Sequence, residues 1–201
     1  MRVIAGKAKS IRLKTIEGMD TRPTTDRIKE TLFNMLQPYL ADCRFLDLFA
    51  GSGGIGIEAL SRGAEYCVFV EQQRKASACI QDNLKTARLA DDARILTMDA
   101  VAAVKKLAQE NKENSRPYDI IFMDPPYNQE LEFKVLEALL DTSLVDEYTT
   151  IVIEASLETT WEKLEALGYD VIKEKRYKTN QHVFVKKGEY NYGNCCISGF
   201  F

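Results

Sequence analysis

The segment Phe45-Leu46-Asp47-Leu48-Phe49-Ala50-Gly51-Ser52-Gly53-Gly54-Ile55-Gly56 decides the fold of this 201-residue chain. Its first half is an apolar run typical of a buried strand, and a glycine-rich loop and an apolar helix pattern follow. Gly51, Gly53 and Gly56 match the spacing G-x-G-x-x-G, whose glycines allow a tight turn and a close approach of backbone to ligand. The segment therefore predicts a strand, a loop and a helix of an open α/β sheet.

Strand and helix patterns alternate from that segment to residue 167. We expect strands over 45–49, 66–70, 94–98, 119–123 and 150–154, and helices over 55–62, 75–88, 100–110, 131–140 and 161–167. This alternation predicts a doubly wound, mostly parallel, Rossmann-like α/β sheet. Only four residues separate the last two predicted strands, 169–176 and 181–187, so we expect these two to form an antiparallel C-terminal hairpin.

Residues 1–40 form a predicted extension to the main domain, which we assign to residues 41–201. The extension begins with a small β-hairpin over 3–14, broken near Gly6. A helix follows from Thr24 or Thr25 to the residue before Pro38, with Ile28, Leu32, Met35 and Leu36 as its apolar stripe. We assign no function to the unusual tail from Cys195 to Phe201.

Composition excludes several classes of protein. The chain is 45% apolar and 28% charged, and it has neither a signal-peptide pattern nor an apolar run of about 18 residues. We therefore expect a cytoplasmic protein that does not span a membrane, with a monomer as the default state. Five cysteines without metal-ligand spacing predict reduced thiols and no metal site. His182 is the single histidine, which argues against a histidine-based triad.

Positive charge is concentrated toward the two ends of the chain. Residues 1–40 hold eight Lys or Arg against four Asp or Glu, and residues 173–188 hold six against one. Residues 41–172 hold 13 against 24. A polyanion would therefore be drawn to the termini rather than to the acidic body. The predicted phosphate contacts in the extension are Lys7, Lys9, Arg12 and Lys14.

Acidic residues at the predicted strand ends suggest a cofactor. Asp47 lies inside its strand, four residues before Gly51, where a carboxylate could receive an α-amino group. Glu71 follows Gly51 by 20 residues and could accept ribose hydroxyls. Asp99 and Ala100 would lie beside an adenine, although Asp99 is also a good helix cap. No second nucleotide-binding half follows, which argues against NAD and favours S-adenosylmethionine. The predicted cofactor-binding residues are Asp47, Phe49, Gly51, Ser52, Gly53, Glu71, Asp99 and Ala100.

Asp124-Pro125-Pro126-Tyr127 directly follows the apolar run 120–123. Neither proline has an N–H, so the strand must stop there and leave in a stiff turn. The Asp124 carboxylate and the Pro125 carbonyl could accept the two hydrogens of an exocyclic amine, and Tyr127 could stack on a flipped base. We therefore predict that all four residues form a catalytic turn for methyl transfer to such an amine.

These motifs together resemble the RsmD-type methyltransferases, over residues 1 to about 187. Asp47 through Gly53 and Asp124 through Tyr127 are shared with many amino-methyltransferases, whereas the N-terminal blocks are more distinctive. The matching blocks are Met1-Arg2-Val3-Ile4-Ala5-Gly6, Asp20-Thr21-Arg22-Pro23-Thr24-Thr25-Asp26-Arg27, Asp47 through Gly53, Glu58-Ala59-Leu60-Ser61-Arg62-Gly63-Ala64 and Asp124 through Tyr127.

The resemblance implies methylation of the N2 amine of one guanine in 16S ribosomal RNA, with S-adenosylmethionine as methyl donor. The partner would be the small ribosomal subunit or its precursor. The resemblance also places Arg22 and Thr24 near the active site, on the N-terminal side.

Two alternative classes stay open at this point. One is another amino-methyltransferase, acting on adenine N6 or on protein glutamine. The first usually carries a target-recognition insertion that this chain lacks, and the second usually has Asn in place of Asp124. The other class is a non-catalytic ribosome-assembly or RNA-binding module, against which the intact Asp124 and Tyr127 argue.

Overall fold

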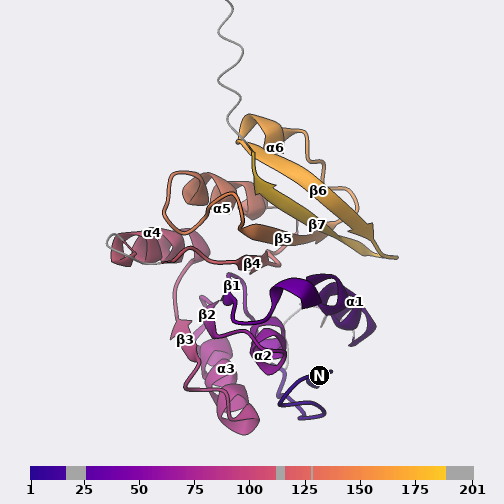
Figure 1. Ribbon diagram of the computed structural model, residues 1–201, viewed down its shortest axis with the longest axis vertical. Helices are drawn as coiled ribbons and strands as arrows, with labels where there is room; N and C mark the ends of the chain where they lie inside the picture. Colours follow the sequence, from indigo (N-terminus) through magenta and orange to yellow (C-terminus); the bar gives the residue numbers. More distant parts are fainter. Residues whose placement is uncertain (17–25, 112–115, 128, 189–201) are drawn as a thin grey trace, which may run out of the picture.

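A seven-stranded sheet runs through the computed structural model, in the order β3-β2-β1-β4-β5-β7-β6 (Figure 1). The structure describes residues 1–16, 26–111, 116–127 and 129–188. Strands β1 to β5 are parallel, and β7 is antiparallel to both β5 and β6. This arrangement confirms the predicted doubly wound sheet with its C-terminal hairpin. The strands are β1 (Arg44–Asp47), β2 (Tyr66–Val70), β3 (Ala93–Leu96), β4 (Ile120–Met123), β5 (Thr150–Ser156), β6 (Tyr169–Arg176) and β7 (Asn180–Lys187).

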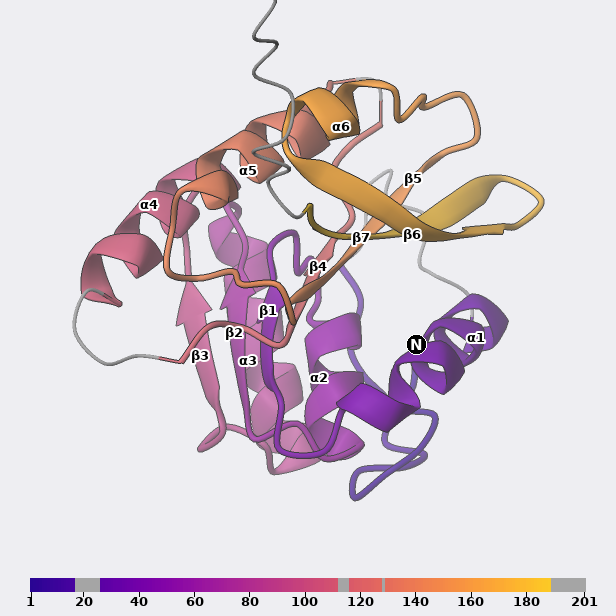
Figure 2. The ribbon, with the colours of Figure 1, turned by 45° about the horizontal axis from the view of Figure 1, so that its top comes forward.

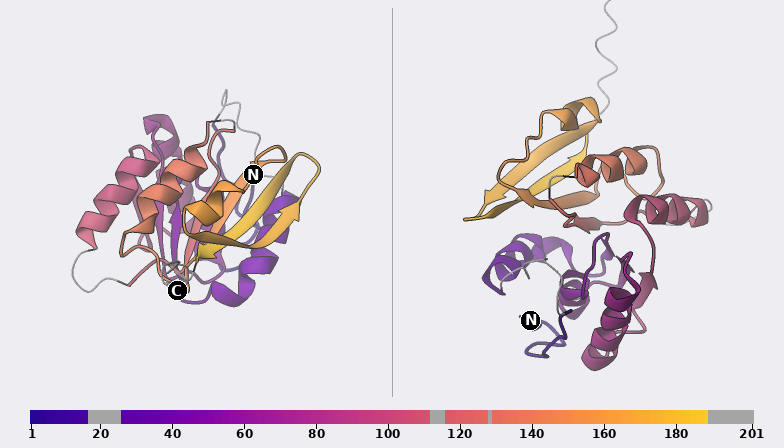
Figure 3. Two further views of the ribbon diagram at one scale, coloured as in Figure 1. Left: turned by 90° about the horizontal axis from the view of Figure 1, so that it is seen from above. Right: turned by 180° about the vertical axis from the view of Figure 1, so that it is seen from behind.

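Helices cover both faces of the sheet (Figures 2 and 3). One apolar core joins the sheet to α1 (Asp26–Leu36), α2 (Gly54–Ser61) and α3 (Arg74–Ala87). A second core joins the opposite face to α4 (Ala100–Glu110), α5 (Leu131–Leu140) and the short α6 (Lys163–Ala166). A 3₁₀ turn, η1 (Gln37–Tyr39), follows α1 and contains Pro38. None of the helices in the described part of the chain has the length and apolarity needed to cross a bilayer.

The registers of the central strands determine which side chains share a face. Asp47 on β1 pairs with Phe122 on β4, which pairs with Val152 on β5. Because side chains alternate between faces along a strand, Asp124 and Glu154, two residues further on, belong to this same face. It is the face covered by α1 and α2, so the acidic residues at the strand ends lie on the side of the N-terminal extension.

The N-terminal segment is held both by its own hydrogen bonds and by α2. Its expected hairpin has one antiparallel bridge, between Arg2 and Arg12, with backbone hydrogen bonds on both sides of it. The N–H groups of Ile4 and Ala5, which follow the bridge, donate to the Glu58 carboxylate of α2 at 2.8 and 3.0 Å. The division of the chain at residue 40 stays a prediction. Val3, Ala8 and Leu13 of the predicted extension belong to the core that is shared with the sheet.

The buried stripe of α1 differs from the predicted one. Lys29, Leu32, Phe33 and Leu36 are buried, whereas Ile28 and Met35 are only half-buried. A lysine occupies the buried face because α2 supplies its partner: the Lys29 ammonium lies 3.1 Å from the Glu58 carboxylate and donates to the Arg2 carbonyl at 2.6 Å. The sequence pattern alone did not indicate this buried ion pair.

Candidate active site

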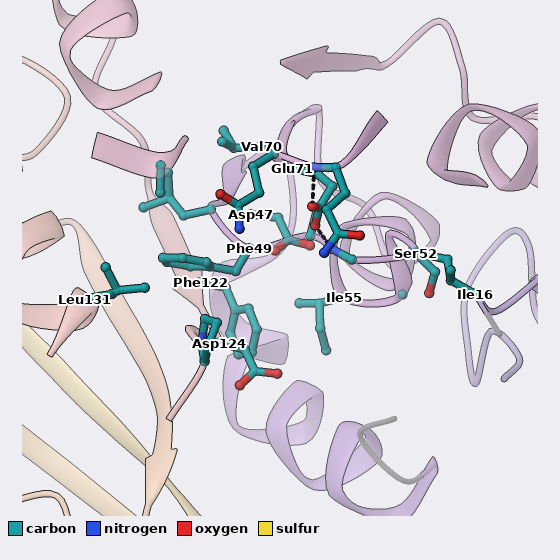
Figure 4. Close-up of a pocket in the computed structure, with 18 of the residues that line it drawn as sticks. Ile16, Asp47, Phe49, Ser52, Ile55, Val70, Glu71, Phe122, Asp124 and Leu131 are labelled. Atoms are coloured by element: carbon teal, nitrogen blue, oxygen red, sulfur yellow. Dashed lines mark hydrogen bonds between the residues drawn. The ribbon is translucent and has the colours of Figure 1, made fainter. Parts of the chain in front are cut away.

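A cavity of about 260 Å³ opens at the carboxyl ends of β1, β2 and β4 (Figure 4). This is the edge at which open α/β sheets bind ligands. Asp47 and Glu71 lie on the side of β1 and β2, and Asp124 and Leu131 lie on the side of β4. Of the predicted site residues, those that line the cavity are Asp47, Phe49, Gly51, Ser52, Glu71, Asp99, Ala100, Asp124 and Pro126.

The glycine-rich loop uses its glycines in different ways. Gly51 and Gly53 have φ values of +54° and +84°, which residues with a side chain rarely adopt. A Cβ on Gly51 would meet no described atom within 4 Å, so this residue leaves open space at the cavity wall. Gly53 does not line the cavity, and it serves the turn instead. Gly56 lets α2 approach β2, because a Cβ there would lie 2.3 Å from the Phe69 ring.

Glu71 fixes the glycine loop with its two carboxylate oxygens. One oxygen accepts the Gly51 N–H at 2.9 Å, and the other accepts the Gln73 N–H at 2.8 Å. The carboxylate is therefore held still at the cavity wall. Each oxygen keeps a further lone pair with which it could accept a ligand hydroxyl.

Asp47 is a buried acid with spare hydrogen-bonding capacity. Its side chain is 1% exposed, and its Oδ2 accepts the Gly56 N–H at 3.1 Å. Its Oδ1 finds no hydrogen-bond partner in the described part of the chain. Burial raises the pKa of Asp47 to about 7, and the Glu71 carboxylate adds to the rise, whereas the N–H groups of Gly56 and Phe49 oppose it. A buried, unpartnered carboxylate oxygen suits a cationic ligand group such as an α-ammonium.

Asp99 caps a helix and also lies at the wall of the cavity. It is the N-cap of α4, where its Oδ1 accepts the Ala102 N–H at 3.0 Å, and it also lines the cavity. The exposed carboxylate therefore has a second oxygen available to a ligand. Phe49 and Ala100 line the same cavity and supply apolar surface.

The turn after β4 brings a further acid, the half-buried Asp124, to the cavity. Burial raises the pKa of Asp124 well above its usual range, and the carboxylates of Glu154 and Asp47 raise it further. Pro125 is buried, and the exposed Pro126 lines the cavity. Tyr127 is 44% exposed and lies outside the lining, so its stacking role stays a prediction.

Several residues line the cavity that the sequence reasoning missed. Phe122 and Leu131 flank the Asp124 turn, and Met98 precedes Asp99. Lys29 comes from α1, and Met1 and Ile16 come from the N-terminal segment. Phe122 could have been found, because it lies two residues before Asp124 on the same strand face. The N-terminal residues gave no such signal, since their placement depends on contacts with α2.

The predicted phosphate contacts of the extension are exposed. Lys7 pairs with Asp92 at 3.1 Å, and Lys14 pairs with Asp82 at 2.7 Å. Lys9 and Arg12 are exposed, and neither forms an ion pair with the described residues. Arg22 and Thr24 lie outside the residues that the structure describes. In that described part, no group of His, Cys, Asp and Glu side chains could hold a metal ion.

The sheet, the glycine loop after β1, the acid after β2 and the Asp-Pro-Pro-Tyr turn after β4 define a methyltransferase of the Rossmann-like class. A solved Escherichia coli structure described as "Putative methyltransferase yhhF" shares this fold with a TM-score of 0.79. It is 31% identical to this chain, and the match covers 94% of this chain and 98% of that one.

The family model described as "Conserved hypothetical protein 95" matches residues 1–186. The Bacillus subtilis protein named "Putative rRNA methyltransferase YlbH" is 47% identical over 148 residues, which are 74% of this chain and 75% of that protein. The Escherichia coli K12 protein named "Ribosomal RNA small subunit methyltransferase D" is 36% identical over 158 residues, 79% of this chain and 76% of that protein. The chain belongs to this family of RsmD-type methyltransferases, which confirms the resemblance noted in the sequence.

Proposed function

We propose that this protein transfers a methyl group from S-adenosylmethionine to the N2 amine of one guanine in 16S ribosomal RNA. One observation carries the proposal: a single cavity is lined both by Asp47, Glu71 and Asp99 and by the Asp124 turn. Residues suited to a nucleoside with an amino-acid tail therefore lie beside a residue suited to an exocyclic amine. The names of the relatives support a ribosomal RNA substrate.

The residues present fit S-adenosylmethionine. The unpartnered Oδ1 of Asp47 would accept the α-ammonium, and Glu71 would accept the ribose hydroxyls. Asp99 would accept from the adenine amine beside Ala100 and Phe49. When it is bound, the cofactor supplies an electrophilic methyl group on a sulfonium, which is already a good leaving group. The protein therefore needs no metal for this step.

The Asp124 turn would prepare the amine for attack. The nitrogen lone pair of an exocyclic amine is delocalised into the ring, which makes it a weak nucleophile. Hydrogen bonds from the amine to the Asp124 carboxylate and the Pro125 carbonyl would turn this lone pair toward the methyl group. Orientation of this kind lowers a barrier by several kcal/mol. Tyr127 would stack on the flipped base.

The RNA would approach from the side of the N-terminal extension. Val3, Ala8 and Leu13, from the segment that carries the phosphate-contact candidates Lys7, Lys9, Arg12 and Lys14, belong to the core on the face covered by α1 and α2. Asp47 lies on this same face. We further propose a cytoplasmic monomer that acts on the small subunit or its precursor and that recognises the assembled particle.

Labelled S-adenosylmethionine and small subunits that lack the modification test the proposal, with nucleoside analysis of the RNA. We expect label in N2-methylguanosine with the wild-type chain and labelling about 1,000-fold slower with Asp124→Asn. Label in N6-methyladenosine would keep the chemistry and change the substrate. Absence of label in RNA, with cofactor binding intact, would overturn the proposal. Parallel reactions with naked 16S RNA separate recognition of the particle from recognition of the sequence.

A further inference from the structure

Glu154 lies next to the Asp124 turn but does not line the cavity. We propose that Glu154, held in place by His182 and Tyr177, is a positioning residue that makes Asp124 the proton acceptor for the target amine. The inference rests on the proposed function only in giving Asp124 that task.

A chain of hydrogen bonds fixes the Glu154 carboxylate. Glu154 is buried, with 6% of its side chain exposed, and its Oε1 accepts from the Asn180 amide. Its Oε2 lies 3.1 Å from Nε2 of His182, which is fully buried, and the Tyr177 hydroxyl lies 3.1 Å from Nδ1 of the same ring. Tyr177 also packs edge-on against His182, with 5.1 Å between ring centroids.

With a neutral His182 ring, one tautomer satisfies every member of this chain. Burial and the nearby Glu154 carboxylate raise the pKa of Tyr177 to about 12, so its hydroxyl keeps its proton and can donate it to Nδ1. Nε2 of His182 then carries the ring proton and donates to Glu154. The single histidine of the chain therefore orients a carboxylate.

The sheet register places this carboxylate beside Asp124. Met123 pairs with Ile153, so Asp124 and Glu154 are the next residues along two adjacent parallel strands, on the same face. Two neighbouring carboxylates resist sharing negative charge, and the one that is held by fewer donors takes up a proton more readily. Consistent with this, Glu154 raises the pKa of Asp124.

Other charged groups also face this position. Asp47 on β1 acts on Asp124 in the same sense as Glu154. Lys29 from α1 lines the same cavity, but its ammonium is paired with Glu58. His182 on β7 acts through Glu154. Among the described groups, Glu154 is therefore the carboxylate whose removal should alter Asp124 most, because it makes the largest charge contribution.

Methyl transfer to the amine would form one bond and break one. The amine nitrogen forms a bond to the methyl carbon with its lone pair, and the electrons of the carbon–sulfur bond leave with the sulfur as a neutral thioether. The nitrogen then carries one proton too many. The ionised form of Asp124 accepts this proton and becomes neutral beside Glu154.

A carboxylate titration tests the inference without any substrate. The full chain, with ¹³C-labelled aspartate, is titrated by NMR in the wild type, in Glu154→Gln and in the control Glu110→Gln. The Asp124→Asn and Asp47→Asn variants assign the resonances of these two aspartates. Glu110 is a suitable control because it is also a carboxylate with a partner, Arg94 at 2.7 Å, but lies at the end of α4 away from the cavity.

We expect the Asp124 midpoint to fall by about one pH unit in Glu154→Gln and to stay unchanged in Glu110→Gln. The acid limb of methyl transfer should move to lower pH by the same amount, with cofactor affinity retained. An unchanged midpoint in Glu154→Gln overturns the inference, and so does a shifted midpoint with an unshifted acid limb. Absence of label on guanine in the subunit assay would instead overturn the proposed function.

A second variant covers the case in which Glu154→Gln does not fold. Tyr177 is half-buried, so Tyr177→Phe removes one hydroxyl with little effect on packing. Loss of this donor frees the His182 ring and loosens Glu154, which should lower the Asp124 midpoint by a smaller amount. A midpoint identical to wild type would contradict the inference.

Discussion

Asp47 and Asp124 are acids on one face of adjacent strands, yet they belong to two differently built halves of the same cavity. The half around Asp47 is local in sequence, since its acids and glycines come from residues 47–99 in chain order. The half around Asp124 depends on distant segments, with Glu154 from β5, His182 from β7 and Lys29 from α1. Binding of a small ligand can be encoded by short loops. Control of a reacting group requires several elements of the sheet.

The strongest test of this comparison removes the charge of each of the two acids in turn. Asp124→Asn should lower methyl transfer about 1,000-fold, because the amide cannot accept a proton, and cofactor affinity should stay within about twofold. Asp47→Asn should show the reverse, with affinity as the main loss, since a charge-assisted hydrogen bond is removed. Single-turnover kinetics and calorimetric titration with S-adenosylmethionine measure the two effects.

The exposed Asp141→Asn, at the end of α5, is the control for both variants. Equal losses of affinity and turnover in both acid variants would mean that the two halves do not differ in role.

The second prediction concerns stability, and it follows from the burial of Asp47. Its pKa rises from 3.8 to about 7 on folding, so the folded state keeps a proton that the unfolded state releases between these values. Stability therefore falls as pH rises through this window, by about 4 kcal/mol, and the loss is complete above pH 7. In Asp47→Asn this pH-dependent part of the free energy of unfolding is absent.

Urea unfolding of the cofactor-free chain at pH 4 and pH 8 checks this second prediction. The wild type should lose free energy of unfolding relative to Asp47→Asn between the two values. A difference between the two chains that does not change with pH would show that Asp47 is not titrating in the folded state.

The third prediction compares two glycines that have positive φ. Gly6→Ala should destabilise the protein by about 3 kcal/mol, since φ is +82° and the new Cβ would lie 1.8 Å from the Ser61 carbonyl oxygen. Gly51→Ala should cost only about 1 kcal/mol, because the space beside it is open, and it should weaken cofactor binding instead. Thermal unfolding and cofactor titration of both variants provide the comparison, and equal destabilisation would contradict it.

The smallest expected effects concern the basic residues that we propose as phosphate contacts. Neutralising Lys7, Lys9, Arg12 and Lys14 to Gln should lower RNA affinity and flatten its dependence on salt, with cofactor binding unchanged. The pair Lys9 and Arg12 should contribute more than Lys7 and Lys14, whose ammonium groups already have carboxylate partners. Removing one cation that binds a phosphate should reduce the salt slope by about 0.7 to 0.9. An unchanged slope in the fourfold variant would exclude this surface.

The sequence predicted the sheet, and it predicted which acids and glycines meet at the Asp47 half of the cavity, for a physical reason. A glycine loop and a strand-end acid act through nearby backbone, so Gly51 and Glu71 could be paired from spacing alone, and the structure joins them at 2.9 Å. Lys29 was missed because a lysine within an apolar stripe becomes a core residue only when an acid such as Glu58 lies opposite. The role of His182 was missed as well, since only the β5–β7 register brings it to Glu154.

The hydrogen bonds between α2 and the N-terminal segment have a consequence for the order of folding. The Lys7 N–H donates to the Ser61 carbonyl oxygen, and the Ala8 N–H donates to the Ser61 hydroxyl. During synthesis these amides must therefore wait for more than fifty further residues before their partners exist. Residues that are made early thus become fixed only once α2 has formed, and Met1 then closes one wall of the cavity. A complete cavity therefore indicates that the N-terminal segment has docked on α2.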